Sequence, residues 1–285
     1  MSEKLRFLEF NLGILFISSS AVLGRYITTD STLATLWRCL IAAACLWLMA
    51  GVLRYSKSFD WNRHGRVMII TSGLMAVHWT GYFYSLDYSN VSVALMTLYT
   101  FPAMTAIIEP IWRRKPIPGK DIGLALVVLM AIYIIAPPFS VSSDMQFAIG
   151  LGLFSAFCYS LRNIWITSIS TYYSGTTLMM YQLAWMSVFL LPALIWIPID
   201  LESTQWIAIL ILGVITTAAG HTLFMRGLTH YKATTASIMA SIVPVYAITL
   251  GYWVLDEVPT IRTMIGGVLI IAVVIVKAVE KRSLS

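Results

Sequence analysis

The side chains of this 285-residue chain that could do chemistry lie inside long apolar stretches, and Glu109 is the sharpest of them. Tyr99, Pro102, Ala106 and Glu109 recur at intervals of three and four residues, so they share one helical face that has the character of a cavity wall. A carboxyl group in this low-dielectric position could carry a proton or contact a substrate. The alternative is a static or gating ion pair, for which Arg162, expected at a similar depth, is the candidate partner.

Three further ionisable side chains lie within apolar stretches. The planar fork of Arg38 matches a substrate carboxylate, although a bond to backbone carbonyls or to Asp30 is the simpler interpretation. His78 and His221 fall near the middle of their stretches, where a histidine either faces a cavity or is satisfied by bonds within the bundle. Trp79 is adjacent to His78 but is expected to point elsewhere. We expect no metal site, because no carboxylate or cysteine accompanies these histidines at ligand spacing.

Aromatic and hydroxyl side chains supply the remaining candidates for a substrate cavity. Aromatic faces stack on apolar solutes and attract cations. The aromatic residues expected to line the cavity are Tyr82, Tyr99, Tyr159, Trp185 and Tyr246. Ser237 and Ser241 offer hydroxyl groups or allow close helix packing. Pro102 and Pro244 each remove a helical hydrogen bond, so they are the hinge candidates.

Ten apolar stretches must position these residues, and each is about as long as a bilayer core is thick. A core of ~30 Å needs ~20 apolar residues per helix. The predicted spans are 7–27, 33–53, 66–86, 91–112, 121–139, 147–168, 176–199, 205–226, 233–254 and 261–279. The composition agrees, with 59% hydrophobic and 11% charged residues. The sequence therefore predicts an all-α integral membrane protein with ten transmembrane helices.

The charged residues behind the net charge of +6 are divided unequally between the two sides of the predicted membrane. If the N-terminus is inside, most lysines and arginines fall at cytoplasmic helix ends and loops. The opposite loops hold Asp30, Asp87, Asp144, Asp200, Glu202, Asp256 and Glu257. This positive-inside pattern predicts a multi-pass protein with both termini in the cytoplasm, and it argues against a nucleic-acid partner.

Two parts of the chain resemble each other at a distance of about half its length. Segments 94–102 and 236–244 both run from alanine to proline over the same number of residues, and segments 116–123 and 259–266 both run from proline to glycine. Matched prolines and glycines are harder to obtain by chance than matched leucines. The pattern therefore predicts an internal repeat.

Each repeat holds five predicted spans, an odd number, so the second repeat would enter the membrane the other way up. We place the two five-helix repeats at 1–140 and 141–285, as parts of one membrane-embedded unit around a central cavity. Inverted repeats are typical of secondary transporters, whose halves rock about a central site.

The order of these motifs resembles the drug/metabolite transporter superfamily, EamA type. The resemblance rests on the two five-helix halves, the Ala-x7-Pro segments, Arg38, Gly-Tyr-Phe-Tyr-Ser-Leu at 81–86 and Asp-Glu-Val-Pro at 256–259. It covers nearly the whole chain and implies ten helices around a central cavity, in a bacterial inner-membrane protein that transports, and commonly exports, small organic metabolites. The chain departs from the family pattern at Ile17-Ser18-Ser19-Ser20, in place of Trp-Gly, and at Arg114-Lys115, in place of a glutamate.

The leading interpretation is a secondary transporter of small metabolites such as amino acids, which moves them across the inner membrane by alternating access, and the family resemblance implies export as the direction. Its partners would be a small-molecule substrate, the lipid bilayer and, as a candidate coupling ion, the proton; we expect a monomer without a cofactor. A multidrug or organic-cation proton antiporter is the alternative within transport. The sequence has no Gly-x4-Gly-Lys-Ser/Thr phosphate loop for ATP. An integral-membrane enzyme, a channel and a scaffold are the rival classes, and none finds its motif in this sequence.

Overall fold

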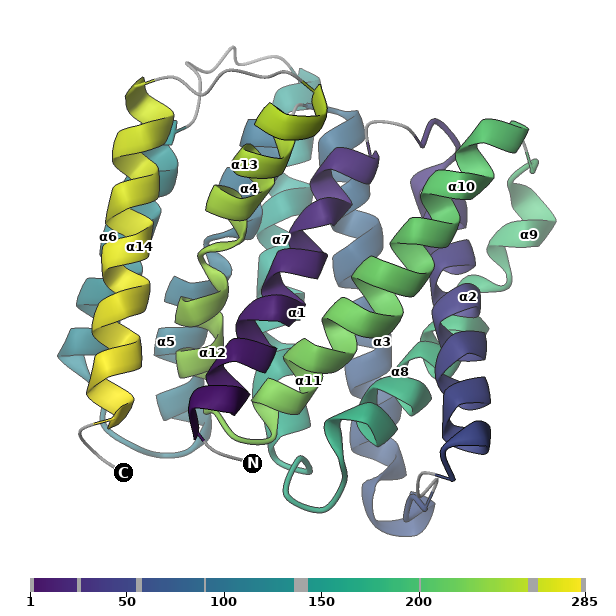
Figure 1. Cartoon of the computed structure of the whole chain (residues 1–285), viewed down its shortest axis with the longest axis horizontal. Coiled ribbons are helices and arrows are strands. Elements are labelled where there is room, and N and C mark those ends of the chain that lie inside the picture. Colours follow the sequence, from purple (N-terminus) through teal and green to yellow (C-terminus); the bar gives the residue numbers. More distant parts are fainter. Residues whose placement is uncertain are drawn as a thin grey trace. The chain divides into compact units, whose positions relative to one another are not determined.

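A computed structural model describes residues 3–24, 27–54, 58–89, 91–135, 143–199, 201–255 and 261–282. Every regular element among these residues is a helix (Figure 1), which confirms the predicted all-α class. The Asp-Glu-Val-Pro motif and the acidic residues Asp200, Asp256 and Glu257 lie outside the described residues.

The helices follow one another along the chain with short connections. They are α1 (Glu3–Gly24), α2 (Ser31–Val52), α3 (Trp61–Asp87), α4 (Val91–Leu98), α5 (Phe101–Trp112), α6 (Gly119–Ile135), α7 (Ser143–Thr167), α8 (Gly175–Leu190), α9 (Ala193–Trp196), α10 (Ser203–Ile211), the π-helix η1 (Leu212–His221), α11 (Thr222–Leu228), α12 (Ala233–Ala240), α13 (Val243–Leu255) and α14 (Ile261–Arg282). Each predicted span overlaps one helix or a run of consecutive helices.

Six helical segments of the described residues are long and apolar enough to cross a membrane. They are Glu3–Gly24, Ser31–Val52, Ser143–Thr167, Gly175–Trp196, Ser203–Leu228 and Ala233–Val254. Among the other predicted spans, α6 has 17 residues and is therefore shorter than a helix that crosses a bilayer core usually is. The chain is thus a membrane protein with multiple candidate spans, and the number ten stays a prediction.

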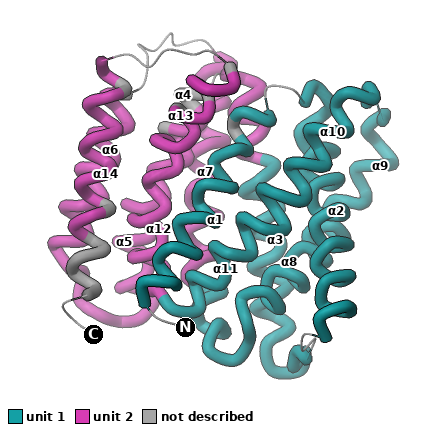
Figure 2. Tube along the Cα trace, in the orientation of Figure 1, with its two compact units in different colours: residues 1–80, 165–230 teal, residues 81–164, 231–285 magenta. Residues whose placement is uncertain are grey.

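Two compact units make up the fold (Figure 2). Unit 1 comprises Met1–Thr80 and Trp165–His230, and unit 2 comprises Gly81–Ile164 and Tyr231–Ser285. Each unit therefore draws on both of the predicted sequence repeats, because helices from one half pack against helices from the other. In unit 1 α2 packs against α8, and in unit 2 α6 packs against α14.

In unit 1 small residues allow helices to approach closely. α1 packs against η1 and α11, and a Cβ atom added at Gly13 would lie 2.7 Å from Leu223 Cβ. The π-helix η1 is held by a side chain as well as by its backbone, since the Thr217 hydroxyl donates to the Leu212 carbonyl at 2.7 Å. π-helical turns are frequent at functional sites, so η1 is a candidate element of such a site.

Unit 2 contains two interrupted helices, α4 followed by α5 and α12 followed by α13. Pro102 and Pro244 are the second residues of α5 and α13. Proline lacks an N–H group and disfavours helical geometry in the residue before it, so each helix ends just ahead of its proline. At the interruptions the backbone bonds tighten to i−3, from Thr100 N to the Thr97 carbonyl at 3.3 Å and from Ser241 N to the Ile238 carbonyl at 3.2 Å.

Candidate functional site

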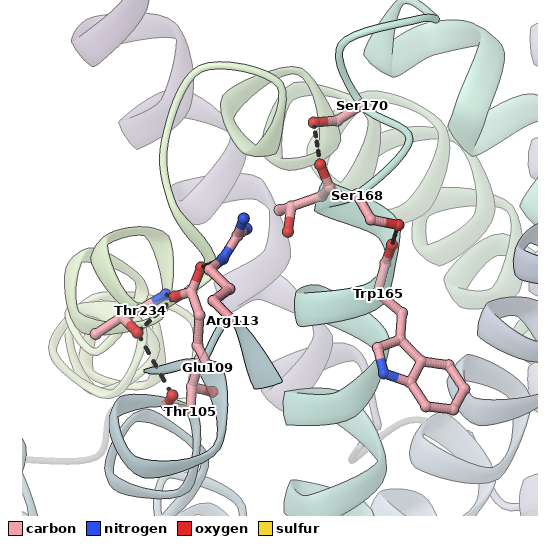
Figure 3. A network of polar contacts seen from close by, with 8 residues as sticks. Thr105, Glu109, Arg113, Trp165, Ser168, Ser170 and Thr234 are labelled. Carbon is pink, nitrogen blue, oxygen red and sulfur yellow. Dashed lines mark hydrogen bonds and ion pairs between the residues drawn. The ribbon is translucent and has the colours of Figure 1, made fainter. Parts of the chain in front are cut away.

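Glu109, in unit 2, is held by three hydrogen bonds. It lies on α5 with 3% of its surface exposed. One carboxylate oxygen accepts from Arg113 Nε at 2.9 Å, and the other accepts from both the backbone N and the hydroxyl of Thr234 at 2.6 Å (Figure 3). Thr234 is the second residue of α12, so the carboxylate occupies the N-terminus of that helix. Free N–H groups and the positive end of the helix dipole favour an anion there.

The expected ion pair between Glu109 and Arg162 is not formed in this structure. Arg113 follows Glu109 by four residues on the same helix, a spacing at which side chains meet without any tertiary contact. Arg162 is 1% exposed and donates from Nη1 to Asn163 Oδ1 at 2.8 Å. The local partner and the end of α12 thus satisfy Glu109.

Three of the expected aromatic residues come together in unit 2, where α4 gives way to α5. Tyr99 lies in that interruption, and its ring centroid is 5.6 Å from that of Phe101. Phe101 in turn contacts Tyr159 of α7, with 4.8 Å between the centroids. Tyr82, at the end of α3, interacts electrostatically with Tyr99. We name these four residues the tyrosine cluster; it is buried and presents phenol hydroxyls beside an interrupted backbone.

A second buried cluster lies in unit 1, around Arg38. Arg38 is 2% exposed, and its Nε donates to the Thr217 hydroxyl of η1 at 3.0 Å. Its guanidinium carbon lies 3.9 Å from the centre of the Trp79 ring, a cation–π distance. The Trp79 ring also contacts His221, with 4.7 Å between centroids. We name these four residues the arginine cluster.

The arginine cluster corrects one expectation from the sequence. Trp79 was expected to point away from the site, yet it joins Arg38 to His221. It shares the buried face of α3 with Met75 and Ser72. Asp30, the simpler partner proposed for Arg38, accepts from the backbone N of Thr32 at 2.8 Å and so caps α2.

The remaining expected residues lie in different surroundings. His78 is buried on α3, and the buried Ser241 lies in the interruption between α12 and α13, where its hydroxyl donates to the Ser237 carbonyl at 3.2 Å. Trp185 of α8 packs 6.0 Å from Trp61, which is 40% exposed at the start of α3. An exposed tryptophan at a helix end, such as Trp61, is typical of an interfacial belt, whereas Trp185 is half-buried within α8.

Sequence reasoning missed Thr234, which donates to Glu109, and Asn163, which accepts from Arg162. A threonine in an apolar stretch carries no charge to attract notice, although Thr234 lies at the expected start of a span, where helix-capping bonds form. Asn163 was missed because the adjacent Arg162 was considered alone. Its amide could have been identified as a partner of that arginine, because buried polar groups are rarely left without a hydrogen bond.

Known proteins place this chain in a family. The EamA-like transporter family matches twice, over residues 10–136 and 146–278. The pseudopaline exporter CntI of Pseudomonas aeruginosa is 27% identical over 224 residues, 78% of either chain. An uncharacterized transporter of Archaeoglobus fulgidus is 25% identical over 195 residues, which are 68% of this chain and 70% of the relative. A crystal structure of another protein shares the fold over the full length of both chains, with a TM-score of 0.83 and 16% identity. The two family matches cover most of the sequence, and the chain therefore belongs to the EamA-like transporter family.

Proposed function

We propose that this membrane transporter is a secondary transporter that exports small organic metabolites, such as amino acids, across the inner membrane by alternating access. The observation that carries the proposal is the pair of interrupted helices in unit 2. Non-helical backbone at membrane depth is tolerated where it is buried in protein or lines a water-filled cavity, and transporters build their substrate sites from such helices. One family match in each half supports the inverted repeat, and the name of the Pseudomonas relative supports export.

Pro102 and Pro244 are the proposed hinges, because each interruption lets the two parts of its helix move separately. The contact between α5 and α12 is then the gate, with Glu109 holding the N-terminus of α12. With both termini in the cytoplasm, as the charge pattern favours, this end of α5 faces the cytoplasm. In this proposal Glu109 acts as a gating residue through its bonds to Thr234.

Substrate contact is assigned to each cluster within its own unit and to two further buried polar residues, His78 in unit 1 and Ser241 in unit 2. The proposed contact residues are Arg38, His78, Tyr82, Tyr99, Tyr159, His221 and Ser241. Aromatic rings beside phenol hydroxyls suit solutes that combine an apolar side chain with polar groups. Glu109 is better placed as a gate than as a substrate ligand, because both of its oxygens accept hydrogen bonds within the protein.

A multidrug or organic-cation proton antiporter is the second candidate. The buried contact of Phe101 with Tyr159 favours it, since aromatic faces attract organic cations. Such an antiporter needs a proton-carrying group, and the buried carboxyl of Glu109 would serve only if protonation released it from Arg113 and Thr234.

Counterflow into sealed proteoliposomes tests the proposal. Vesicles loaded with one unlabelled amino acid should accumulate the same labelled amino acid transiently and without chemical change. Failure of every amino acid in the panel would refute amino-acid transport, and chemical alteration of the solute would indicate an enzyme. Counterflow of organic cations that responds to an imposed pH gradient, and loses this response in Glu109→Gln, would favour the antiporter instead.

A further inference from the structure

We propose that Arg162 and Asn163, on α7, form the subsite that binds the carboxylate group of the transported solute. This inference rests on the proposed transport function and names the substrate class that the protein would accept. Neither residue belongs to the substrate contacts assigned above, and both lie beside the tyrosine cluster in unit 2.

Burial of Arg162 is the first step of the argument. Its side chain is among the largest fully buried ones in the protein. A charged group within a membrane span is costly and therefore marks a functional site. Its identified neighbours include the Asn163 amide oxygen, at 2.8 Å, and the Tyr159 phenol, which interacts with it electrostatically. Both of these neighbours are polar groups that orient the guanidinium.

The amide of Asn163 is the second step. A guanidinium can only donate, so the atom of Asn163 that faces Arg162 must be the oxygen Oδ1. The Nδ2 atom then carries two N–H donors on the other side of the amide. It is fully buried and approaches the Tyr159 hydroxyl; that oxygen can accept from one of the two N–H groups, and the other meets no acceptor of good geometry among the described residues. Buried donors are rarely left in this state, so a bound acceptor is the expected occupant.

The two donor groups together match a carboxylate. A carboxylate has two oxygens with about four acceptor positions, and it forms its strongest hydrogen bonds with charged donors such as arginine. An ammonium group offers donors only and would face the donors of Asn163. The pair therefore selects for an acceptor with negative charge.

The surroundings define the rest of the solute. Tyr159 lies one helical turn before Arg162 and Asn163, and its ring packs on Phe101 at the start of α5. The Ser160 hydroxyl donates to the Phe101 carbonyl at 3.1 Å and ties this part of α7 to the interruption between α4 and α5. A carboxylate held by the pair would thus lie close to aromatic faces, which suits an amino acid with an apolar or aromatic side chain.

Three probes separate the contributions of the charged groups: phenylalanine, 3-phenylpropionate without the ammonium group, and phenethylamine without the carboxylate. Binding is measured as thermal stabilisation of the full-length protein in detergent. We expect the two carboxylates to bind and phenethylamine to bind about 10- to 100-fold more weakly, the ratio expected for charge-assisted hydrogen bonds.

Two variants test the pair. Asn163→Asp keeps an oxygen toward Arg162 and changes only Nδ2 to oxygen, so carboxylate affinity should fall roughly 100-fold while that of phenethylamine does not fall. Arg162→Lys keeps the charge and loses the fork, and should weaken carboxylate binding about tenfold. The matched control is Asn62→Asp, which makes the same chemical change at an exposed position of α3 and should leave all three affinities unchanged.

The subsite is refuted if the wild-type protein binds phenethylamine as well as the carboxylates, or binds neither carboxylate. It is also refuted if both variants keep the wild-type preference. Should Asn163→Asp fail to fold, Arg162→Lys decides the question alone. Counterflow by the wild-type protein is measured separately: transport of some solute without a carboxylate preference would preserve the proposed function and overturn only the subsite.

Discussion

Replacing Glu109 by glutamine should open the contact between α5 and α12. Three donors converge on the carboxylate: Arg113 Nε, the Thr234 backbone N–H and the Thr234 hydroxyl. Glutamine offers a single acceptor oxygen, and its NH2 group must then face one of these donors. The variant Glu109→Gln therefore loses charge-assisted bonds and creates a donor–donor contact while its size stays the same.

The magnitude follows from these bonds. A hydrogen bond to a charged group contributes about 1.5–3 kcal/mol, and loss of a helix N-terminal cap costs about 1 kcal/mol. The ion pair with Arg113 adds little, because the Arg113 side chain is 37% exposed and solvent screens it. A combined loss of about 2–3 kcal/mol would shift the equilibrium away from the closed contact by about 30- to 150-fold.

Cysteine labelling measures this shift. Ser237 lies on α12 one turn beyond Thr234 and is fully buried, and a Ser237→Cys change is nearly isosteric. In a background without the native cysteines and in inside-out vesicles, a water-soluble maleimide reaches Cys at this position only when the contact opens. Its labelling rate tracks the open population, so it should rise about 30- to 150-fold when Glu109→Gln is added.

The matched control is Glu9→Gln. Glu9 forms an ion pair with Arg226 at 2.9 Å, the same N–O distance as in the pair between Glu109 and Arg113, but within unit 1. The labelling rate should stay at the wild-type level in this control. An unchanged rate in Glu109→Gln, or an equal rise in both variants, would show that the carboxylate does not hold the gate.

Three further changes test other parts of the argument. Thr234→Val removes one hydrogen bond to the charged carboxylate and keeps the backbone N–H, so in the same labelling assay the rate should rise about tenfold, for a loss of about 1.5 kcal/mol. Pro102→Ala restores an N–H that can bond to the Leu98 carbonyl and continue the helix, so counterflow should slow while substrate binding, measured by thermal stabilisation, is retained. Gly213→Ala would bring a Cβ within 2.7 Å of a side chain of α2 and should destabilise the protein by about 1–3 kcal/mol in thermal unfolding, whereas Gly123→Ala, which meets nothing within 4 Å, should not.

The helical class and the interruptions were accessible from the sequence for direct physical reasons. Long apolar stretches admit few structures other than helices, and proline removes an N–H wherever it occurs. The shared face of Tyr99, Ala106 and Glu109 was also predictable, because helical periodicity depends only on spacing; all three side chains are buried in the structure.

The hydrogen-bond partners of buried side chains and the rotation of helices about their axes were harder to predict. Thr234 is 125 residues from Glu109, and nothing in the local sequence indicates which helix end will contact a buried carboxylate. The neighbouring Arg113 could have been found from its spacing alone. Trp79 was misplaced because α3 is apolar on several faces, so its pattern does not determine how the helix is rotated about its axis.

The position of Arg113 on the same helix as Glu109 has a consequence for energetics in a living cell. An elementary charge that crosses the whole membrane potential exchanges about 2.3 kcal/mol per 100 mV with it. Glu109 and Arg113 are separated by one helical turn and travel together when α5 moves, so their opposite charges cross the field as a neutral pair. If the contact between α5 and α12 is the gate, this pair adds almost no electrical work to its opening, whether the cell is energised or de-energised, so the gate itself would contribute no voltage dependence to transport.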